Sequence, residues 1–504
     1  MAGTLSGGAV PPSLKPMPNQ VLVQDNYIDF NNLANGQWAQ QYLPELYEAE
    51  VERYGNRTLG GFLRMVGAEM PMTSDQVIWS EQNRLHVAYK GVTVSAAGSG
   101  YPKIDIEIDP AFGGGLGTNP ATSGLRVGNT ILISDATTGL TVIKALIVRL
   151  ENADGYTVKA EIYNEAASGT GQTGGIPDSL LGDDACTLFV YGSEFPKGSN
   201  GMTGAIEPGV TTFTNSPIIL KDNYELSGSD AAQIGWIEVA TEDGTSGYLW
   251  YLKAEAETRL RFEDYLEMSM VEGEKMATAS TSFGSEFLGS ASTQNIKGTE
   301  GLFAAIEDRG NIYTGFSSTG VGSGALADFD DILKQLDKQG AIEENMLFLS
   351  RETALEFDNM LAAVNASVDK GASYGLFDNE AEMALNFGFT GFRRGSYDFY
   401  KTDWKYLNDA TTRGLDNQID GVMIPAGTST VYDQMMGSNI RRPFLHVRYR
   451  ASETEDRRFK AWITGSVGGA YTTDLDVLRV NFLSERCLVT QAANNFVLFK
   501  GASS

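Results

Sequence analysis

The sequence is poor in the side chains on which most catalytic and metal-binding sites depend. Its 504 residues include two histidines, His86 and His446, and two cysteines, Cys186 and Cys487. Two cysteines about 300 residues apart exclude by count a disulfide framework and a multi-cysteine metal site. The histidines stand in no spacing typical of a catalytic triad or a metal cluster, so we interpret both as structural. We therefore expect reduced thiols, no cofactor and no enzymatic activity.

Long apolar runs and an excess of positive charge are also missing. No run approaches the ~18 consecutive apolar residues of a transmembrane helix. The first twenty residues lack the basic and apolar segments of a signal peptide, which indicates a cytosolic product. With Lys+Arg 38 against Asp+Glu 64, the net charge is −26. Such an acidic chain is unsuited to bind nucleic acid or an anionic membrane by long-range attraction.

The longest helix-like stretch runs from Leu249 to Ala277 and contains one glycine, no proline and few β-branched residues. Most of its residues lose little conformational freedom in a helix. At about 1.5 Å per residue it predicts a helix roughly 40 Å long, well beyond the average for globular proteins. The following side chains recur at helical spacing and are expected to form its buried stripe: Leu249, Leu252, Ala256, Leu260, Leu266 and Met270. Such a helix suits a thin, wide protein better than a compact enzyme.

Residues 124–192 predict a small all-β unit, because strand-like segments alternate there with turn signals. Asp154-Gly155 is a preferred pair for the turn of a β-hairpin. Glycine-rich stretches flank the unit, including residues 113–117, and indicate that it is inserted into a larger domain.

Three acidic residues, Asp105, Glu107 and Asp109, alternate with isoleucines just before this unit. The alternation predicts a strand with the carboxylates on one face. Carboxylate oxygens are ligands for Ca²⁺, but a solvated strand face explains the same pattern. The sequence leaves both interpretations open.

The remaining segments combine helices and strands. Helices are predicted at 36–55 and at 328–340, the latter ending at Gly340. A strand at 345–350 followed by a helix at 351–364 forms a β-α unit, and most later segments alternate like strands. The chain is therefore predicted to be α+β with one all-β insertion.

One segment departs from the acidic balance, because it carries seven positive and three negative charges between residues 441 and 460. Guanidinium groups pair with carboxylates and with phosphates. We therefore treat this basic cluster as a candidate contact with another subunit or with DNA, and a network of ion pairs within the chain is the alternative. Its members are Arg441, Arg442, Arg448, Arg450, Arg457, Arg458 and Lys460.

The order of these parts resembles a tailed-bacteriophage major capsid protein of the Hong Kong 97 type, most similar to those of crAss-like phages. Three stretches carry the resemblance: TNSPIILKDNYELSGSDAAQIGW before the long helix, GTEGLFAAIEDRG after it, and DVLRVNFLSERCLVTQAANNFVLFKG at the end. The resemblance covers nearly the whole chain and rests on its layout, since the family has no diagnostic motif.

The resemblance implies a division of the chain into named parts. An N-terminal arm and helix would occupy 1–75, and the two arms of an extended (E) loop would occupy 76–123 and 201–248. An inserted β domain would occupy 124–200, and a peripheral (P) domain with its spine helix at 249–277 would occupy 249–369. An axial (A) domain would follow at 370–440, and residues 441–504 would return as strands to the P and A domains.

The function implied by the resemblance is self-assembly into pentamers and hexamers, which form the icosahedral shell around a double-stranded DNA genome. Its partners would be copies of itself, the portal and head-fibre or decoration proteins, with packaged DNA touched only non-specifically. It would be located in the virion after assembly in the bacterial cytoplasm, without contact to a membrane.

Two other functions are compatible with parts of the sequence. A surface fibre or carbohydrate-binding protein would explain the β insertion and the 57 glycines, but it leaves the long helix without a role. A hydrolase with two catalytic carboxylates would fit the 64 acidic residues, but that abundance singles out no pair.

Overall fold

A computed structural model describes most of the chain from residue 61 onward. The described residues are 61–82, 86–96, 103–108, 123–151, 155–163, 172–173, 176–204, 210–233, 238–240, 246–276, 296–314, 324–340, 342–367, 391–415, 418–433, 438–467 and 471–501. The predicted N-terminal arm to residue 60, the helix at 36–55, Asp109 and Asp154 lie outside these ranges. The chain forms two compact units: one combines residues 1–78 with 214–504, and the other consists of residues 79–213.

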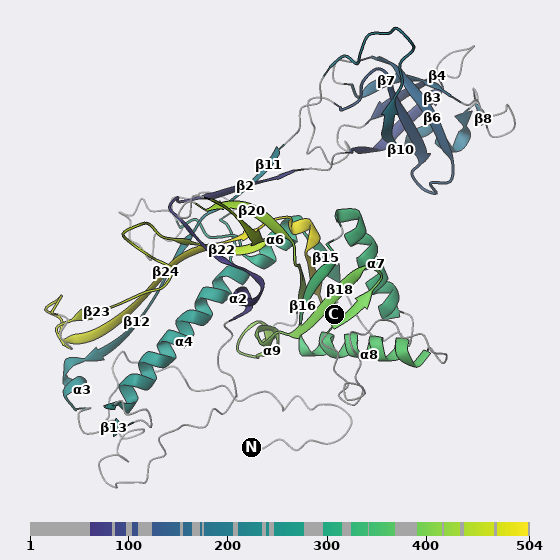
Figure 1. Cartoon of the computed structure of the whole chain (residues 1–504). Coiled ribbons are helices and arrows are strands. Elements are labelled where there is room, and N and C mark those ends of the chain that lie inside the picture. The colour runs from purple at the N-terminus through teal and green to yellow at the C-terminus, as the bar shows by residue number, and fades with distance from the viewer. Residues whose placement is uncertain are drawn as a thin grey trace. The chain divides into compact units, whose positions relative to one another are not determined.

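The unit of residues 79–213 is built on a closed antiparallel barrel with the strand order β10-β3-β4-β7-β6-β5 (Figure 1). These strands are β3 (Ala88–Ala96), β4 (Lys103–Ile108), β5 (Asn129–Asp135), β6 (Val142–Leu150), β7 (Thr157–Ile162) and β10 (Gly182–Ser193). Alternate side chains point inward and are buried, as in Val158, Ala160 and Ile162 of β7. The short elements β8 (Gln172–Thr173), β9 (Ile176–Pro177) and η2 (Asp178–Leu180) complete the unit. Its core is therefore independent of the rest of the chain.

Strands β5, β6, β7 and β10 of the predicted all-β segment lie in the barrel, but the barrel also takes in strands before its predicted start at residue 124. That the unit is an insertion into a capsid fold stays a prediction. Strands β3 and β4, which were assigned to the first arm of an extended loop at 76–123, pair within the barrel. The glycine-rich stretch 113–117 suggested a boundary, yet the strands on both sides of it belong to one sheet. Residues 113–117 themselves lie outside the described ranges. Long-range pairing, which local composition does not reveal, decides whether a stretch between two strands divides two units.

The hairpin predicted at residues 154–155 is present between β6 and β7, which pair antiparallel. Gly155 adopts a φ of +72°, in the left-handed region that favours glycine. Two further strands, β2 (Val77–Gln82) and β11 (Val210–Asn215), pair with each other where the chain leaves and re-enters the larger unit.

The larger unit contains two principal sheets. The first, the long-strand sheet, has the order β1-β22-β24-β12, and β23 also pairs with β24. Its strands are β1 (Glu69–Met72), β12 (Ile218–Ser227), β22 (Leu445–Arg450), β23 (Lys460–Gly465) and β24 (Val477–Thr490). The 14-residue β24 is its axis, because β12 runs along one edge while β22 and β23 share the other.

The second, the six-stranded sheet, has the order β15-β25-β19-β16-β18-β17. Its strands are β15 (Asn311–Thr314), β16 (Glu344–Leu349), β17 (Gly391–Arg394), β18 (Tyr397–Asp403), β19 (Ile419–Pro425) and β25 (Val497–Lys500). Helices α7 (Gly324–Gln339) and α8 (Arg351–Ser367) pack on one face, through side chains such as Phe329 and Phe357. Helices α2 (Phe62–Val66), α6 (Leu302–Arg309) and α9 (Lys405–Asn408) contribute to the core on the other face. The predicted β-α unit, β16 followed by α8, is confirmed.

This sheet crosses two predicted domain boundaries. It takes β15 and β16 from the predicted P domain, β17 to β19 from the predicted A domain and β25 from the C-terminal segment. The boundary predicted at residue 370 therefore does not separate two folding units. Parallel pairing of β16 with β18 joins its two sides, and such non-local pairing leaves no signal in local composition.

The predicted long helix is confirmed as α4 (Leu249–Glu272), which crosses Figure 1 as the longest helix. It ends five residues before the predicted end at Ala277, with Gly273 immediately after it. A Cβ at Gly273 would lie 2.6 Å from the carbonyl oxygen of Ser269 and 2.7 Å from that of Thr299. The close approach of residues 299–301 therefore requires glycine at this helix end.

The predicted buried stripe of α4 is only partly correct. The side chains of Leu249 and Leu252 lie outside the described ones. From residue 254 onward the buried side chains are Thr258, Phe262, Leu266, Met270 and Val271, whereas Ala256 is exposed and Leu260 is 36% exposed. Phe262 and Leu266 pack against Val480 and Phe482 of β24, and Met270 and Val271 belong to the core beneath the six-stranded sheet. Thus α4 packs on the long-strand sheet, and its last turn lies in a core to which both sheets contribute.

Smaller elements fill the connections. They are α3 (Gly228–Gln233), β13 (Glu238–Ala240), β14 (Ser246–Tyr248), η5 (Arg413–Leu415), β20 (Thr428–Asp433), β21 (Ser438–Pro443) and η6 (Ala493–Asn495). Strands β20 and β21 form an antiparallel hairpin. The predicted end of α7 is also confirmed, since Gly340 has a φ of +139° and its N–H donates to the carbonyl oxygen of Leu336.

Candidate functional site

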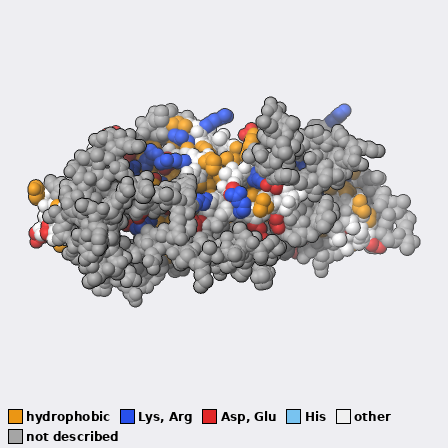
Figure 2. All heavy atoms as spheres, turned by 90° about the horizontal axis from the view of Figure 1, so that it is seen from below, with side chains coloured by type: hydrophobic (Ala, Val, Ile, Leu, Met, Phe, Trp, Pro, Cys, Tyr) orange, Lys and Arg blue, Asp and Glu red, His pale blue; other side chains and the backbone are white. Residues whose placement is uncertain are grey.

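The predicted basic cluster is spread over three strands. Arg441 and Arg442 lie on β21, Arg448 and Arg450 on β22, and Lys460 on β23, with Arg457 and Arg458 just before β23. In the face shown in Figure 2, Lys and Arg side chains of the described residues lie among hydrophobic and acidic ones. The members of the cluster thus come from three strands and from the segment just before β23.

Four members of the cluster form ion pairs within the chain. Arg450 pairs with Asp75, and Arg457 Nε lies 2.7 Å from Glu485 Oε2. Arg458 pairs with Glu69, and Lys460 pairs with Glu455. Each of these pairs joins a residue on a strand of the long-strand sheet to a residue in a loop, as the alternative interpretation of an intrachain network expects.

Glu69 of β1 also approaches Arg486, a residue that the sequence analysis did not single out. Arg486 Nη1 lies 3.6 Å from Glu69 Oε1, and its Nε and Nη2 donate to Ser484 Oγ and the carbonyl oxygen of Arg458. Burial lowers the pKa of Arg486, and the nearby carboxylate of Glu69 opposes that shift. Arg486 is therefore a structural cation held by its hydrogen bonds.

The other three members of the cluster differ from one another. Arg448 Nη1 donates to the carbonyl oxygen of Pro71 at 3.4 Å, which ties β22 to β1. Arg441 is exposed and Arg442 is half-buried, and both lie on the β20–β21 hairpin opposite Thr430 and Ser429. A contact of these two arginines with another subunit or with DNA stays a prediction.

His446 and Cys487 lie on facing strands but form no catalytic pair. His446 is 1% exposed, and its Nδ1 lies 3.1 Å from the carbonyl oxygen of Pro443. Burial, with smaller contributions from Arg448 and Arg442, lowers the pKa of His446 to about 4. Burial raises the pKa of the Cys487 thiol to about 12. A neutral histidine beside a protonated thiol offers neither a base nor a nucleophile near neutral pH.

The carboxylates of β4 lie on the face of the strand that points away from the barrel core. Asp105 pairs with Lys159 of the neighbouring strand β7, with 3.8 Å between Asp105 Oδ1 and Lys159 Nζ. Lys159 also pairs with Glu151. Glu107 is exposed. Within the described ranges, no group of three or more His, Cys, Asp or Glu side chains is placed to hold a metal ion. The Ca²⁺ interpretation gains no support from this geometry.

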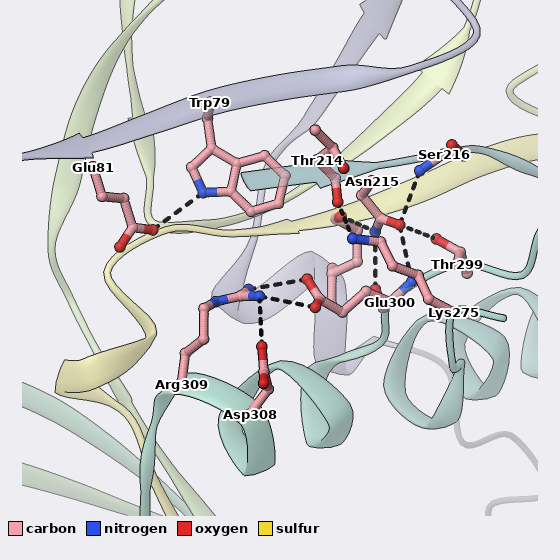
Figure 3. Close-up of polar contacts among 11 residues, drawn as sticks. Trp79, Glu81, Thr214, Asn215, Ser216, Lys275, Thr299, Glu300, Asp308 and Arg309 are labelled. Carbon is pink, nitrogen blue, oxygen red and sulfur yellow. Dashed lines mark hydrogen bonds and ion pairs between the residues drawn. The ribbon is translucent and has the colours of Figure 1, made fainter. Parts of the chain in front are cut away.

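A buried hydrogen-bond junction, centred on Asn215, lies where the chain re-enters the larger unit (Figure 3). Asn215 is 1% exposed. Its Nδ2 donates to the carbonyl oxygens of Glu300 (3.0 Å) and Leu488 (2.7 Å). Its Oδ1 accepts from the N–H groups of Ser216 and Glu300 and from the Thr299 hydroxyl. One side chain thus links the end of β11, which leads into β12, with the segment before α6 and the axis strand β24.

Charged groups surround this junction (Figure 3). Arg309 forms a bidentate pair with Glu300 at 2.8 and 2.9 Å, and both side chains are largely buried. The Lys275 ammonium donates to the carbonyl oxygen of Thr214, and Gly301 N–H donates to the carbonyl oxygen of Gly273. The junction therefore also fixes the C-terminal end of α4. The junction could not be predicted from the residues, because Asn-Ser-Pro at 215–217 is typical of an exposed turn.

Comparisons with known proteins do not assign the chain to a family. No family model matches it, and no curated protein matches it. Among the described helices, none is long and apolar enough to cross a membrane.

Several solved phage structures align with most of the chain at low similarity. A structure titled "Microbacterium phage Oxtober96" is 10% identical, with 92% of this chain and 97% of that chain covered and a TM-score of 0.38. One titled "Mycobacterium phage Bobi" is 8% identical, with 91% and 96% covered and a TM-score of 0.37. One titled "Capsid of native GTA particle computed with C5 symmetry" is 10% identical, with 93% and 99% covered and a TM-score of 0.34. Sequence identities and TM-scores this low do not show the function of the chain.

Proposed function

We propose that this chain is a structural, shell-forming protein, the major capsid protein of a tailed bacteriophage with a Hong Kong 97-type fold. The observation that carries the proposal is α4, a 24-residue helix that packs on the long-strand sheet and ends in a core to which both sheets contribute. Phe262 and Leu266 contact the long-strand sheet, while Met270 and Val271 belong to the shared core. This is the geometry expected of the spine helix in the P domain of that family.

The end of α4 is bound to α9 and η5, which lie in the connection between β18 and β19 of the six-stranded sheet. The Tyr406 hydroxyl donates to Glu272 Oε1 at 2.6 Å, and Arg413 Nη1 lies 3.5 Å from Glu272 Oε2. At about 1.5 Å per residue, α4 spans about 36 Å, so it can transmit load across a wide subunit. Subunits of this kind would assemble as pentamers and hexamers into an icosahedral shell around double-stranded DNA.

The charge of the chain supports this role. An acidic lining lets a genome be packed and released without adhering to the shell. The net charge of −26 is spread over a chain whose basic cluster is largely paired internally. Arg441 and Arg442 are then the members of that cluster best placed to contact another subunit.

The finer assignments follow from the same proposal. The protein would be located in the virion after assembly in the bacterial cytoplasm. It would act without a cofactor or catalytic activity. It would resemble the major capsid proteins of crAss-like phages. Copies of itself, a portal and head-fibre or decoration proteins would be its partners, and β2, β11 and β12 would belong to the extended loop.

Negative-stain electron microscopy of the purified full-length chain tests the proposal. Shells, or five- and six-membered capsomers, are the expected result. Rods would support a fibre protein instead, and dispersed monomers at every concentration would overturn the proposal.

A further inference from the structure

The outer surface of the barrel carries a row of side chains that crosses four neighbouring strands. Phe189 of β10 lies opposite Leu132 of β5, which lies opposite Lys144 of β6. Tyr163, directly after β7, continues the row, because its N–H donates to the carbonyl oxygen of Lys144. A β-bulge follows Val190 in β10 and brings Tyr191 into the adjoining position. Aromatic rings and charged groups are therefore gathered on one outer face.

The aromatic rings of this face are exposed. Phe189 is 41% exposed, and Tyr163 and Tyr191 are each 48% exposed. We call Phe189, Tyr191 and Tyr163 the aromatic face of the barrel. Exposed rings gathered on one surface indicate a contact with another molecule more often than isolated exposed residues do.

Neighbouring groups hold the two tyrosine rings in place. The Tyr163 hydroxyl donates to Glu194 Oε2 at 2.5 Å, and Lys144 Nζ lies 5.8 Å from the centre of the Tyr191 ring. The backbone beyond β10 is fixed as well, because Glu194 N–H donates to the carbonyl oxygen of Gly128. Rings that are fixed before binding lose little conformational entropy when a ligand stacks on them.

The shape of the face argues against a protein strand or a large protein surface as its ligand. Every barrel strand in the closed order pairs on both sides, so the barrel offers no edge to which a strand could add. Three rings that are each about half exposed present on the order of 300 Å². A standard protein interface buries about 800 Å² on each partner, so this face suits a smaller ligand.

The chemistry of the face narrows the ligand further. Rings stack on flat molecules. The Lys144 ammonium lies over the Tyr191 ring and can donate hydrogen bonds, and Glu194, which accepts from the Tyr163 hydroxyl, can accept them. Nucleotides stack on aromatic rings too, but their binding requires a basic groove for the phosphates, whereas this face has Lys144 beside Glu194 and the chain has a net charge of −26. A neutral sugar ring has apolar faces and hydroxyl edges and carries no charge to be repelled.

We propose that the aromatic face of the barrel binds a neutral polysaccharide, with pyranose rings stacked on Phe189 and Tyr191 and hydroxyl groups bonded to Lys144 and Glu194. This activity is separate from shell formation. It would hold a particle weakly at each subunit and strongly through many copies.

Affinity electrophoresis of the full-length chain tests this inference. Native gels would contain, one at a time, a soluble β-glucan, a mannan, a galactan, an arabinoxylan or the anionic polysaccharide alginate. We expect at least one neutral polysaccharide to retard the wild-type chain. Tyr191→Ala and Phe189→Ala should each weaken the retardation about tenfold. Leu140→Ala is the matched control, since Leu140 is an apolar residue of the same unit and 88% exposed, and it should leave the retardation unchanged.

Three results would overturn the inference. They are no retardation by any neutral polysaccharide, retardation by alginate alone, and retardation that the two ring variants leave unchanged. If the ring variants prevented assembly of the chain without changing retardation, the face would instead be a contact between copies of the chain. Because binding is measured on the unassembled chain, failure of this inference and failure of the shell proposal are distinguishable.

Discussion

Phe262 of α4 stacks on Phe482 of β24, with 5.9 Å between the ring centres and 27° between the ring planes. The two side chains are 0% and 3% exposed. Phe459 contacts both rings and completes an aromatic cluster between the helix and the long-strand sheet. This cluster fixes the central part of α4 to the long-strand sheet, while Met270 and Val271 of its last turn are buried in a core to which both sheets contribute.

Replacing Phe262 with alanine should therefore destabilise the larger unit strongly. We expect Phe262→Ala to lower the free energy of unfolding by about 3–5 kcal/mol, because it removes a fully buried aromatic ring and leaves a cavity. Urea unfolding of the unassembled chain, followed by tryptophan fluorescence, measures the change. Leu260→Ala, on the more exposed side of the same helix, should cost less than about 1 kcal/mol. Equal losses in the two variants would contradict the described orientation of α4.

Removal of the Asn215 side chain should open the junction between the end of β11, β24 and the segment before α6. In Asn215→Ala, the buried carbonyl oxygens of Glu300 and Leu488 lose a donor and the Glu300 N–H loses its acceptor. We expect a loss of about 2–4 kcal/mol, since each unsatisfied buried group costs roughly 1–3 kcal/mol. Hydrogen exchange should become faster at the Glu300 amide. Asn223→Ala, at an exposed position of β12, is the control and should leave that amide unchanged; equally fast exchange in both variants would argue against the junction.

A structural feature of this chain could be predicted from the sequence where neighbouring residues determine it, and could not where residues distant in the sequence determine it. The span of α4 was predictable because a run of helix-favouring residues without proline specifies a helix locally. Its buried stripe was not, because Leu260 and Phe262 fit helical spacing equally well and only the packing of Phe482 selects between them. The pairing of β3 with β10, strands about 90 residues apart, also leaves no local signal.

The candidate site shows the same division. The local excess of positive charge at 441–460 was visible in the sequence, but its acidic partners, such as Glu69 and Glu485, lie on distant strands. Asn215 occupies a segment that is typical of a turn, and its five hydrogen bonds arise only from tertiary packing.

His446 should make stability depend on pH. Its pKa in the folded chain is lowered to about 4 from an ordinary value of 6.5, so the unfolded chain binds a proton more readily. Its contribution is fully present above pH 6.5 and is lost as the pH falls toward 4, by about 3 kcal/mol in total.

Substitution of His446 tests this dependence. The difference in unfolding free energy between the wild type and His446→Gln should change over pH 4–6.5 and stay constant above pH 7. A pH-independent difference for His446→Gln would show that His446 is not held neutral by burial.

The two thiols should be unreactive in the folded chain. Cys186 and Cys487 are both 0% exposed, and burial raises their pKa values to about 11 and 12. Since the thiolate is the reactive form, iodoacetamide at pH 8 should label neither in the native chain and both in urea. Mass spectrometry counts the labels, and rapid native labelling of Cys487 would contradict the burial of the face it shares with His446.

Sedimentation velocity of the purified full-length chain, over a hundredfold range of concentration, tests the central claim most directly. If α4 is the spine of a shell subunit, the 54.4 kDa chain should sediment as pentamers, hexamers or larger closed particles. A single species of the mass of one chain at every concentration would contradict the claim.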